Sequence, residues 1–409
     1  MDARDSIITL QLGHYANFVG SHFWNTQEAS FVYPDSNRRT NVSPDDLEIN
    51  HGVLFREGVT GRGEVTFTPR LVSVDLKNAL GSLPIQGDLY DKPPTTSHDQ
   101  LESVREKSVH WAGTVDMTVE ENEDRNDFLS SLDQEEKERQ QRISGSTNGS
   151  SSDHEMQTVG KEPFRLESQV KVWSDFLRAR YHPRTNVVVQ DYQHGDFSIN
   201  PFDTYGLGHN ASADLLEEIE DRVRYFAEEC DSLKGFHLLT DSHTGFGGLS
   251  VRIAEILGED YGSSKTLVAF PLTPSMPDMT EQMKAATGLV PAAFCTSMFL
   301  NSALTCHGLA SGPCGLTSPL SVLKDTFPIM KTGNDHVRSL GLSSEYQPQL
   351  AYHSSAVLAS ALDTLTLPWR SYNGSAPISS LVTELNRSDH YHNFYLLLFS
   401  QPTVSFFNS

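Results

Sequence analysis

Short runs of apolar, often β-branched residues recur along the chain and predict buried strands. We expect strands at Ile7–Leu12, Leu71–Leu76, Val187–Gln190, Gly235–Leu239 and Lys265–Phe270. Near-continuous apolar runs of this length are typical of strands that are covered on both faces of a parallel sheet.

Stretches with apolar residues at helical spacing lie between these runs. Ala213–Cys230 predicts an amphipathic helix, and a shorter helix is expected at Val251–Leu257, ending at Gly258. A further helical stretch follows Gly13. The apolar face of the first helix has six members: Leu215, Leu216, Ile219, Val223, Phe226 and Cys230. Strands that alternate with helices favour an α/β fold with a doubly wound parallel sheet.

The pattern breaks between about Lys92 and Glu162. This region contains "VEENEDRNDFLSSLDQEEKERQQRISGSTNGSSSDHE", which is acidic, rich in serine and poor in apolar residues. Such a segment buries too little surface to offset the entropy of ordering, so we expect a disordered insertion. It is either a solvated loop or a docking segment regulated by phosphorylation of its serines.

The charge balance excludes two classes of partner. The formal net charge is −22, from 53 acidic and 31 basic residues, so direct binding to nucleic acid or to an anionic lipid surface is not expected. Four cysteines are too few for a disulfide framework and favour a reducing compartment. Cys306, His307 and Cys314 lack paired metal-ligand spacing, so no metal site is predicted.

Targeting signals are also not expected. The opening "MDARDSIITLQL" is acidic, unlike a secretory signal or a matrix presequence. The apolar stretch Leu289–Cys306 is interrupted by Pro291, Ser297 and Asn301, so we interpret it as core rather than a transmembrane segment.

A glycine-rich turn carries the main candidate chemistry. The stretch "LLTDSHTGFGGLSVRIAEIL", residues 238–257, predicts a strand, a turn and a helix. Free N–H groups at a helix N-terminus suit an anion, and Gly245, Gly247 and Gly248 would permit positive φ. Glycines that only permit close packing would give the same pattern. A hydrolase triad made of the consecutive Asp241, Ser242 and His243 is excluded, because three adjacent residues cannot converge on one centre.

Several segments resemble tubulins in the same order. They are "LQLGHYANFVGSHFW" (Leu10–Trp24), "TPRLVSVDLK" (Thr68–Lys77), "YGLGHN" (Tyr205–Asn210) and "CDSLKGFHLLTDSHTGFGG" (Cys230–Gly248). Two others, "WSDFLRARYHPRTN" (Trp173–Asn186) and "LDTLTLPWR" (Leu362–Arg370), are similar to the Misato family. Members of that family are tubulin-like proteins associated with mitochondrial distribution, morphology and fusion.

The resemblance implies a domain organisation. Residues 1–91 and 163–275 would form a tubulin-like nucleotide-binding domain, interrupted by the insertion at 92–162. Residues 276–409 would form an incomplete intermediate-type domain, because the chain ends before the family pattern does, as a truncated isoform would.

The ligand that the resemblance implies is GTP or GDP. Seven positions match the tubulin loops that surround it and are the expected cofactor-binding residues: Gln11, Gly13, Asn17, Thr244, Gly245, Gly247 and Gly248.

Other positions depart from the tubulin pattern. His14, Tyr15 and Ala16 replace the usual Gln, Cys and Gly, and "NPFDT" stands where tubulins have a glycine-rich turn. Lys77 takes the place of an acid that helps to hold magnesium. The segment His353–Ser360, equivalent to the loop with the catalytic acid, has no carboxylate. We therefore expect a degenerate nucleotide site with no catalytic residue.

The function that the resemblance implies is regulation of mitochondrial distribution, morphology and fusion. The protein would be cytoplasmic and peripheral to the mitochondrial outer membrane, with protein partners on that surface or on the cytoskeleton. The alternatives are a cytoskeletal or chaperonin-linked assembly factor for tubulin or the spindle, and a weak GTPase.

Overall fold

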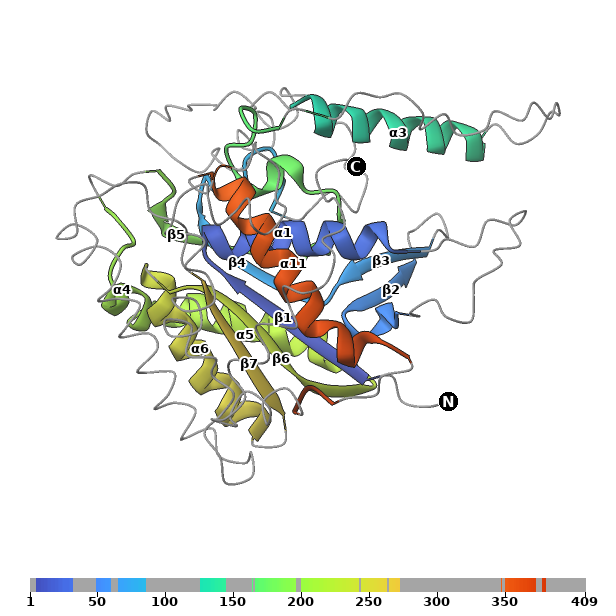
Figure 1. Cartoon of the computed structure of the whole chain (residues 1–409). Coiled ribbons are helices and arrows are strands. Elements are labelled where there is room, and N and C mark those ends of the chain that lie inside the picture. The colour runs from blue at the N-terminus through green and yellow to red at the C-terminus, as the bar shows by residue number, and fades with distance from the viewer. Residues whose placement is uncertain are drawn as a thin grey trace, which may run out of the picture.

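A parallel sheet between two layers of helices forms the body of the protein (Figure 1). In this computed structural model the structure describes the following residues: 5–31, 49–59, 65–85, 126–144, 164, 166–195, 200–242, 244–262, 265–272, 347, 350–372 and 377–379.

The sheet has five strands in the order β5-β4-β1-β6-β7. Every neighbouring pair in it is parallel. Their bounds are β1 Asp5–Leu12, β4 Leu71–Lys77, β5 Asn186–Gln193, β6 Ser232–Asp241 and β7 Thr266–Leu272. All five predicted strands are therefore confirmed, as is the α/β class with a doubly wound parallel sheet.

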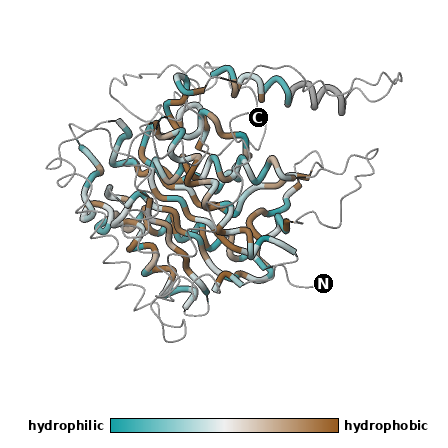
Figure 2. Tube along the Cα trace, in the orientation of Figure 1, coloured by the Kyte–Doolittle hydropathy of each residue, from teal (hydrophilic) through white to brown (hydrophobic). Residues whose placement is uncertain are grey.

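Helices cover both faces of the sheet. Helices α1 (His14–Ala29) and α11 (Ala351–Arg370) contribute to one apolar cluster, and α5 (Ala213–Glu228) and α6 (Gly245–Tyr261) to the other. The sheet strand β1 contributes Ile7 to the first cluster and Leu10 to the second, as alternating residues of a strand must. The hydrophobic positions accordingly concentrate along the strands of the central sheet (Figure 2).

Shorter elements surround this body. Strands β2 (Phe55–Val59) and β3 (Val65–Pro69) form an antiparallel hairpin next to the 3₁₀ helix η1 (His51–Val53). A second 3₁₀ helix, η2 (Trp173–Phe176), lies against α1, and the short helix α4 (Tyr205–His209) lies against α6.

Helix α6 is longer than the sequence predicted. It begins at Gly245 and continues through Gly258 to Tyr261, so the prediction that Gly258 ends it is wrong. A single internal glycine costs only about 1 kcal/mol, and packing of Tyr261 on Phe236, with ring centroids 5.0 Å apart, stabilises the last turn. The helix ends instead at Gly262, whose φ is +62°.

Part of the predicted disordered insertion is helical. Residues Asp127–Ser144 form α3, so the prediction of disorder is wrong for them. The side chain of Asn126 accepts from Leu129 N (2.9 Å) and donates to Asp175 O (2.7 Å), and Phe128 packs on Phe164. These tertiary contacts to the η2 region compensate for the low apolar content of the helix itself.

Other sequence predictions fall outside the described residues. These include the apolar stretch 289–306, the Cys306, His307 and Cys314 group, and most of the intermediate-type domain at 276–409. The part of that domain that is described, α11, packs on α1. Among the described helices, none combines the length and apolar character needed to cross a bilayer. The three boundaries between the four predicted segments stay a prediction.

Candidate functional site

The predicted site residues lie at the carboxyl edge of the sheet, where β1 and β6 lead into α1 and α6. Gln11, Gly13 and Asn17 come from β1 and α1, and Thr244, Gly245, Gly247 and Gly248 come from the start of α6. This edge is where open parallel sheets place their ligands. The structure thus brings both groups to the same edge.

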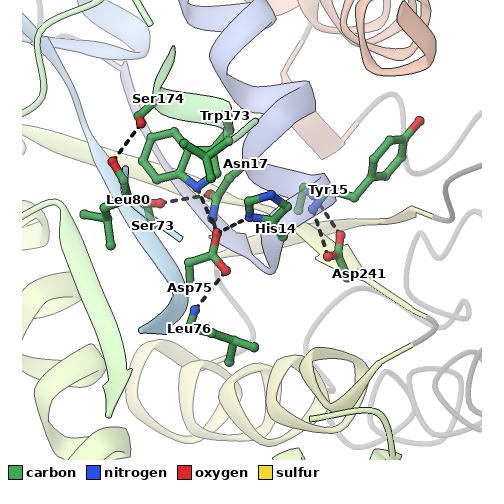
Figure 3. A network of polar contacts seen from close by, with 12 residues as sticks. His14, Tyr15, Asn17, Ser73, Asp75, Leu76, Leu80, Trp173, Ser174 and Asp241 are labelled. Atoms are coloured by element: carbon green, nitrogen blue, oxygen red, sulfur yellow. Dashed lines mark hydrogen bonds and ion pairs between the residues drawn. The ribbon is translucent and has the colours of Figure 1, made fainter. Parts of the chain in front are cut away.

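The N-terminus of α1 is occupied by a carboxylate from the neighbouring strand. Asp241, the last residue of β6, accepts a hydrogen bond from Tyr15 N at 2.9 Å and another from Ala16 N at 2.7 Å (Figure 3). One N–H reaches each carboxylate oxygen. Backbone donors at a helix N-terminus are the groups that hold a bound anion, and here a side chain takes them.

Gly13 makes this contact possible. Its φ is +112°, and a Cβ on this residue would lie 2.5 Å from Cγ of Asp241. Its own N–H donates to Val74 O at 3.0 Å, which anchors the turn to β4. The glycine expected to approach a phosphate therefore approaches a carboxylate.

Burial dominates the electrostatics of Asp241. Its side chain is buried, which raises its pKa to about 7, and the nearby Asp75 adds to the rise. The hydrogen bonds from Tyr15 N and Ala16 N act in the opposite direction, because they favour the ionised form. Asp241 therefore titrates near neutral pH.

Asp75 is a second buried carboxylate, at the end of β4, and it has different partners. It accepts from Trp173 Nε1 at 2.8 Å and from Asn17 Nδ2 at 3.1 Å, and it lies 3.2 Å from His14 Nδ1 (Figure 3). Burial alone would raise its pKa, but His14 and the hydrogen bonds from Leu76 N and Asn17 outweigh burial and lower the pKa. Asp75 therefore remains ionised.

Asn17 and Gln11 both point into the protein. Asn17 is fully buried; its amide donates to Val74 O and Asp75, and its oxygen accepts from Ser73 Oγ at 2.9 Å. Gln11 lies under α1 against Gly20, where a Cβ would come within 2.0 Å of its amide nitrogen. Neither amide atom of Gln11 has a hydrogen-bond partner among the described residues. Asn17 therefore ties α1 to β4, whereas Gln11 packs beneath Gly20.

Two glycines at the start of α6, Gly245 and Gly248, are explained by packing. The ring of Phe202 lies 2.8 Å from where a Cβ on Gly245 would be, and Tyr205 O lies 1.9 Å from that of Gly248. Gly245 N donates to Phe202 O at 3.0 Å, and Thr244 Oγ1 accepts from Phe246 N at 3.3 Å.

The α6 glycines do not use the positive φ that glycine permits. Gly245, Gly247 and Gly248 lie in the first turns of α6, and none of the three is among the positive-φ glycines. Glycine is present at Gly245 and Gly248 because Phe202 and α4 approach them too closely for a side chain. A glycine that lets a phosphate approach the backbone would give the same local sequence. His243 lies outside the described residues.

Two further expectations concerned catalysis. Lys77 is exposed at the end of β4, beyond a register shift, and its carbonyl accepts from His194 N at 2.8 Å. The segment His353–Ser360 is not a loop, because it lies in α11 with Ser354 and Ser355 buried. Ser354 Oγ accepts from the Tyr15 hydroxyl at 3.0 Å, so the segment faces α1 of the same chain.

The residues at this edge do not fit a phosphate group in the arrangement that the structure shows. The donors of Tyr15 and Ala16 are taken by Asp241, and the Gly245 donor is taken by the Phe202 carbonyl. An ionised carboxylate at the same place would also repel a phosphate. In the described part of the chain, no three His, Cys, Asp or Glu side chains group as metal ligands.

Sequence reasoning missed the two carboxylates and Trp173. Asp75 lies near the end of β4 and Asp241 ends β6, and because these strands flank β1 in a parallel sheet, the two carboxylates lie at one edge. Their positions near the ends of predicted strands were the available signal, whereas the strand order that brings them together was not. Trp173 lies 98 positions from Asp75 and carried no local signal.

Comparison with known families follows the two halves of the chain. Residues 5–134 match the Misato Segment II tubulin-like domain, and residues 163–371 match a tubulin domain. Protein misato homolog 1 of Danio rerio is 35% identical over 404 residues, covering 93% of this chain and 61% of the relative. For Protein misato homolog 1 of Homo sapiens the identity is 34%, with coverage of 91% and 60%.

A relative from another organism gives the same result. Protein misato of Drosophila melanogaster is 35% identical over 381 residues, covering 90% of this chain and 60% of the relative. The chain thus spans about three fifths of the length of the curated relatives it matches.

Proposed function

Because the chain belongs to the Misato family of tubulin-like proteins, we propose that it regulates mitochondrial distribution, morphology and fusion. The family membership is the observation that carries this proposal. The similarity to the Misato relatives extends over about nine tenths of the chain, on both sides of the insertion.

The proposed place of action is the cytoplasmic face of the mitochondrial outer membrane, as a peripheral protein. The net charge of −22 supports attachment through a protein partner, because it opposes direct adhesion to anionic lipid. The partner would be a protein of the mitochondrial surface or of the cytoskeleton.

Depletion in cells that express the chain tests the role. The mitochondrial network should fragment or collapse, and re-expression of residues 1–409 should restore it. An unchanged network and an unchanged fusion rate would contradict the proposal.

Fractionation tests the location. Carbonate extraction should release the protein from mitochondria, and protease added to intact organelles should digest it. A protein that survives protease until the outer membrane is ruptured would exclude the cytoplasmic face.

The second candidate is a cytoskeletal or chaperonin-linked assembly factor for tubulin or the spindle. The tubulin-domain match over residues 163–371 favours it. Spindle failure on depletion, with mitochondrial shape intact, would make this the better interpretation.

A degenerate nucleotide site is part of the proposal. The Asp241 contact to α1 and the Phe202 contact to α6 support it, because both use donors that a phosphate would need. The ligand to test is GTP or GDP, titrated as a labelled nucleotide into the purified chain. Saturable binding followed by phosphate release would instead favour a weak GTPase.

A further inference from the structure

We propose that this chain carries its own anion in the position of a nucleotide phosphate, and that the anion is the carboxylate of Asp241. The inference rests on the degenerate site proposed above and states what makes it degenerate. The chain would close the site with a built-in group rather than merely lack binding residues.

The contact has the form of an anion site. Two consecutive N–H groups in the first turn of α1, those of Tyr15 and Ala16, reach the two oxygens of one carboxylate at 2.9 and 2.7 Å. The positive end of the α1 dipole faces the same group. A phosphate bound to this terminus would need the same two donors.

The surrounding backbone is shaped for the carboxylate. Gly13 adopts φ +112°, and any larger residue there would place a Cβ 2.5 Å from Oδ2 of Asp241. Asp241 is only 3% exposed, and it comes from the strand next to β1, so it reaches α1 without a loop of its own. The fit is between fixed elements, which makes the contact a stable part of the fold.

At the N-terminus of α6, a neutral carbonyl group accepts the backbone N–H that a phosphate would need. Gly245 N, at the start of α6, donates to the carbonyl of Phe202 at 3.0 Å, and the Phe202 ring covers the same turn. Phe202 belongs to the "NPFDT" segment. The N-terminal donors of α1 are thus occupied by the carboxylate of Asp241, and that of α6 by the carbonyl of Phe202, from another part of the chain. Only the carboxylate, when ionised, also repels a phosphate by its charge.

Removing the Asp241 carboxylate should open the α1 terminus to anions. Asp241→Ala removes both bulk and charge, and Asp241→Asn removes the charge alone. Asp175→Ala is the matched control, since the Asp175 carboxylate also accepts two backbone N–H groups, from Lys171 and Val172, but at a different place.

The probes are GDP and inorganic pyrophosphate, titrated by calorimetry into the purified chain of residues 1–409 at a pH above 7, where the Asp241 carboxylate is ionised. Wild type and Asp175→Ala should give no binding heat up to about 1 mM ligand. Asp241→Ala should gain affinity by about ten-fold or more, because two N–H donors become free for a charge-assisted contact. Asp241→Asn should show a smaller gain.

Three results would overturn the proposal. They are no gain in Asp241→Ala when circular dichroism shows it to be folded, no gain in a folded Asp241→Asn, and an equal gain in Asp175→Ala. If Asp241→Ala does not fold, Asp241→Asn alone decides. Mitochondrial rescue is scored separately, so a wild-type chain that fails to rescue contradicts the proposed function and leaves the calorimetric result standing.

Discussion

Replacing Gly13 with alanine should destabilise the protein through two separable effects. The first is the backbone: Gly13 has φ +112° and ψ 161°, a region that is almost restricted to glycine. Forcing a residue with a Cβ into it costs about 1–3 kcal/mol.

The second effect is displacement of Asp241. The new Cβ would lie 2.5 Å from the Cγ and Oδ2 atoms of Asp241, so the carboxylate must move away from Tyr15 N and Ala16 N. Each hydrogen bond to a charged group contributes about 1.5–3 kcal/mol. Part of that is regained if the displaced carboxylate reaches water, so we expect a total loss for Gly13→Ala of about 4 kcal/mol in the free energy of unfolding.

Urea denaturation followed by tryptophan fluorescence measures the loss, and a double-mutant cycle with Asp241→Ala separates the two effects. In the Asp241→Ala background, Gly13→Ala should cost only the free energy of the strained backbone. The interaction energy between Gly13→Ala and Asp241→Ala should therefore be about 1–3 kcal/mol. Gly195→Ala is the control for backbone strain alone, because Gly195 has φ +85° and no atom of the described residues lies within 4 Å of its Cβ position.

An equal cost of Gly13→Ala in both backgrounds would refute the proposed contact between this residue and Asp241. A cost no larger than that of Gly195→Ala would show that the displacement effect is absent.

Three other predictions use thermal or chemical unfolding. Gly248→Ala should cost more than about 2 kcal/mol because its Cβ would lie 1.9 Å from a backbone oxygen, whereas Gly206→Ala, with no atom of the described residues within 4 Å of its Cβ position, should be neutral or stabilising. Burial lowers the pKa of His237 to about 3, below its unfolded value of 6.5, so the stability present above that value is lost as pH falls. Between about pH 7 and pH 5 wild type should lose about 2 kcal/mol more than His237→Leu, and equal slopes would contradict this. Arg56→Met removes a two-pronged pair with Glu229, at 2.7 Å each, but should cost only about 1 kcal/mol because the pair is partly exposed.

The sequence predicted the sheet well because the strands are buried on both faces. Near-continuous apolar runs such as Leu71–Leu76 and Gly235–Leu239 are typical of central strands in a parallel sheet. In the structure they lie in β4 and β6. The start of α6 was not predictable in the same way. A glycine that lets Phe202 approach and a glycine that lets a phosphate approach give the same local sequence, and only the tertiary partner distinguishes them.

The sequence predicted where the site lies in the fold, but not which groups its residues contact. Gln11, Gly13 and Asn17 do lie at the expected edge, yet their contacts are internal. Asp241 was considered only together with Ser242 and His243 as a triad, so its role at α1 was missed. A carboxylate at the end of β6 can cap the helix after β1 only because the two strands are neighbours, and strand order is not contained in any local pattern.

The two segments that resemble the Misato family both form hydrogen bonds with side chains of α1. In Trp173–Asn186, Trp173 donates to Asp75, and the backbone N–H of Arg178 and of Ala179 donate to Asn25 Oδ1 on α1.

In Leu362–Arg370, the buried guanidinium of Arg370 donates to Gln27 Oε1 on α1 and pairs with Asp363 at 2.6 Å. One segment therefore fixes α1 beside β4, and the other fixes it beside α11. The Asp241 contact requires α1 to stay in register with β6, because its hydrogen bonds to Tyr15 N and Ala16 N tolerate little displacement. The family-specific segments and the closed helix terminus consequently form one structural unit around α1, within a sheet that the tubulin-like segments supply.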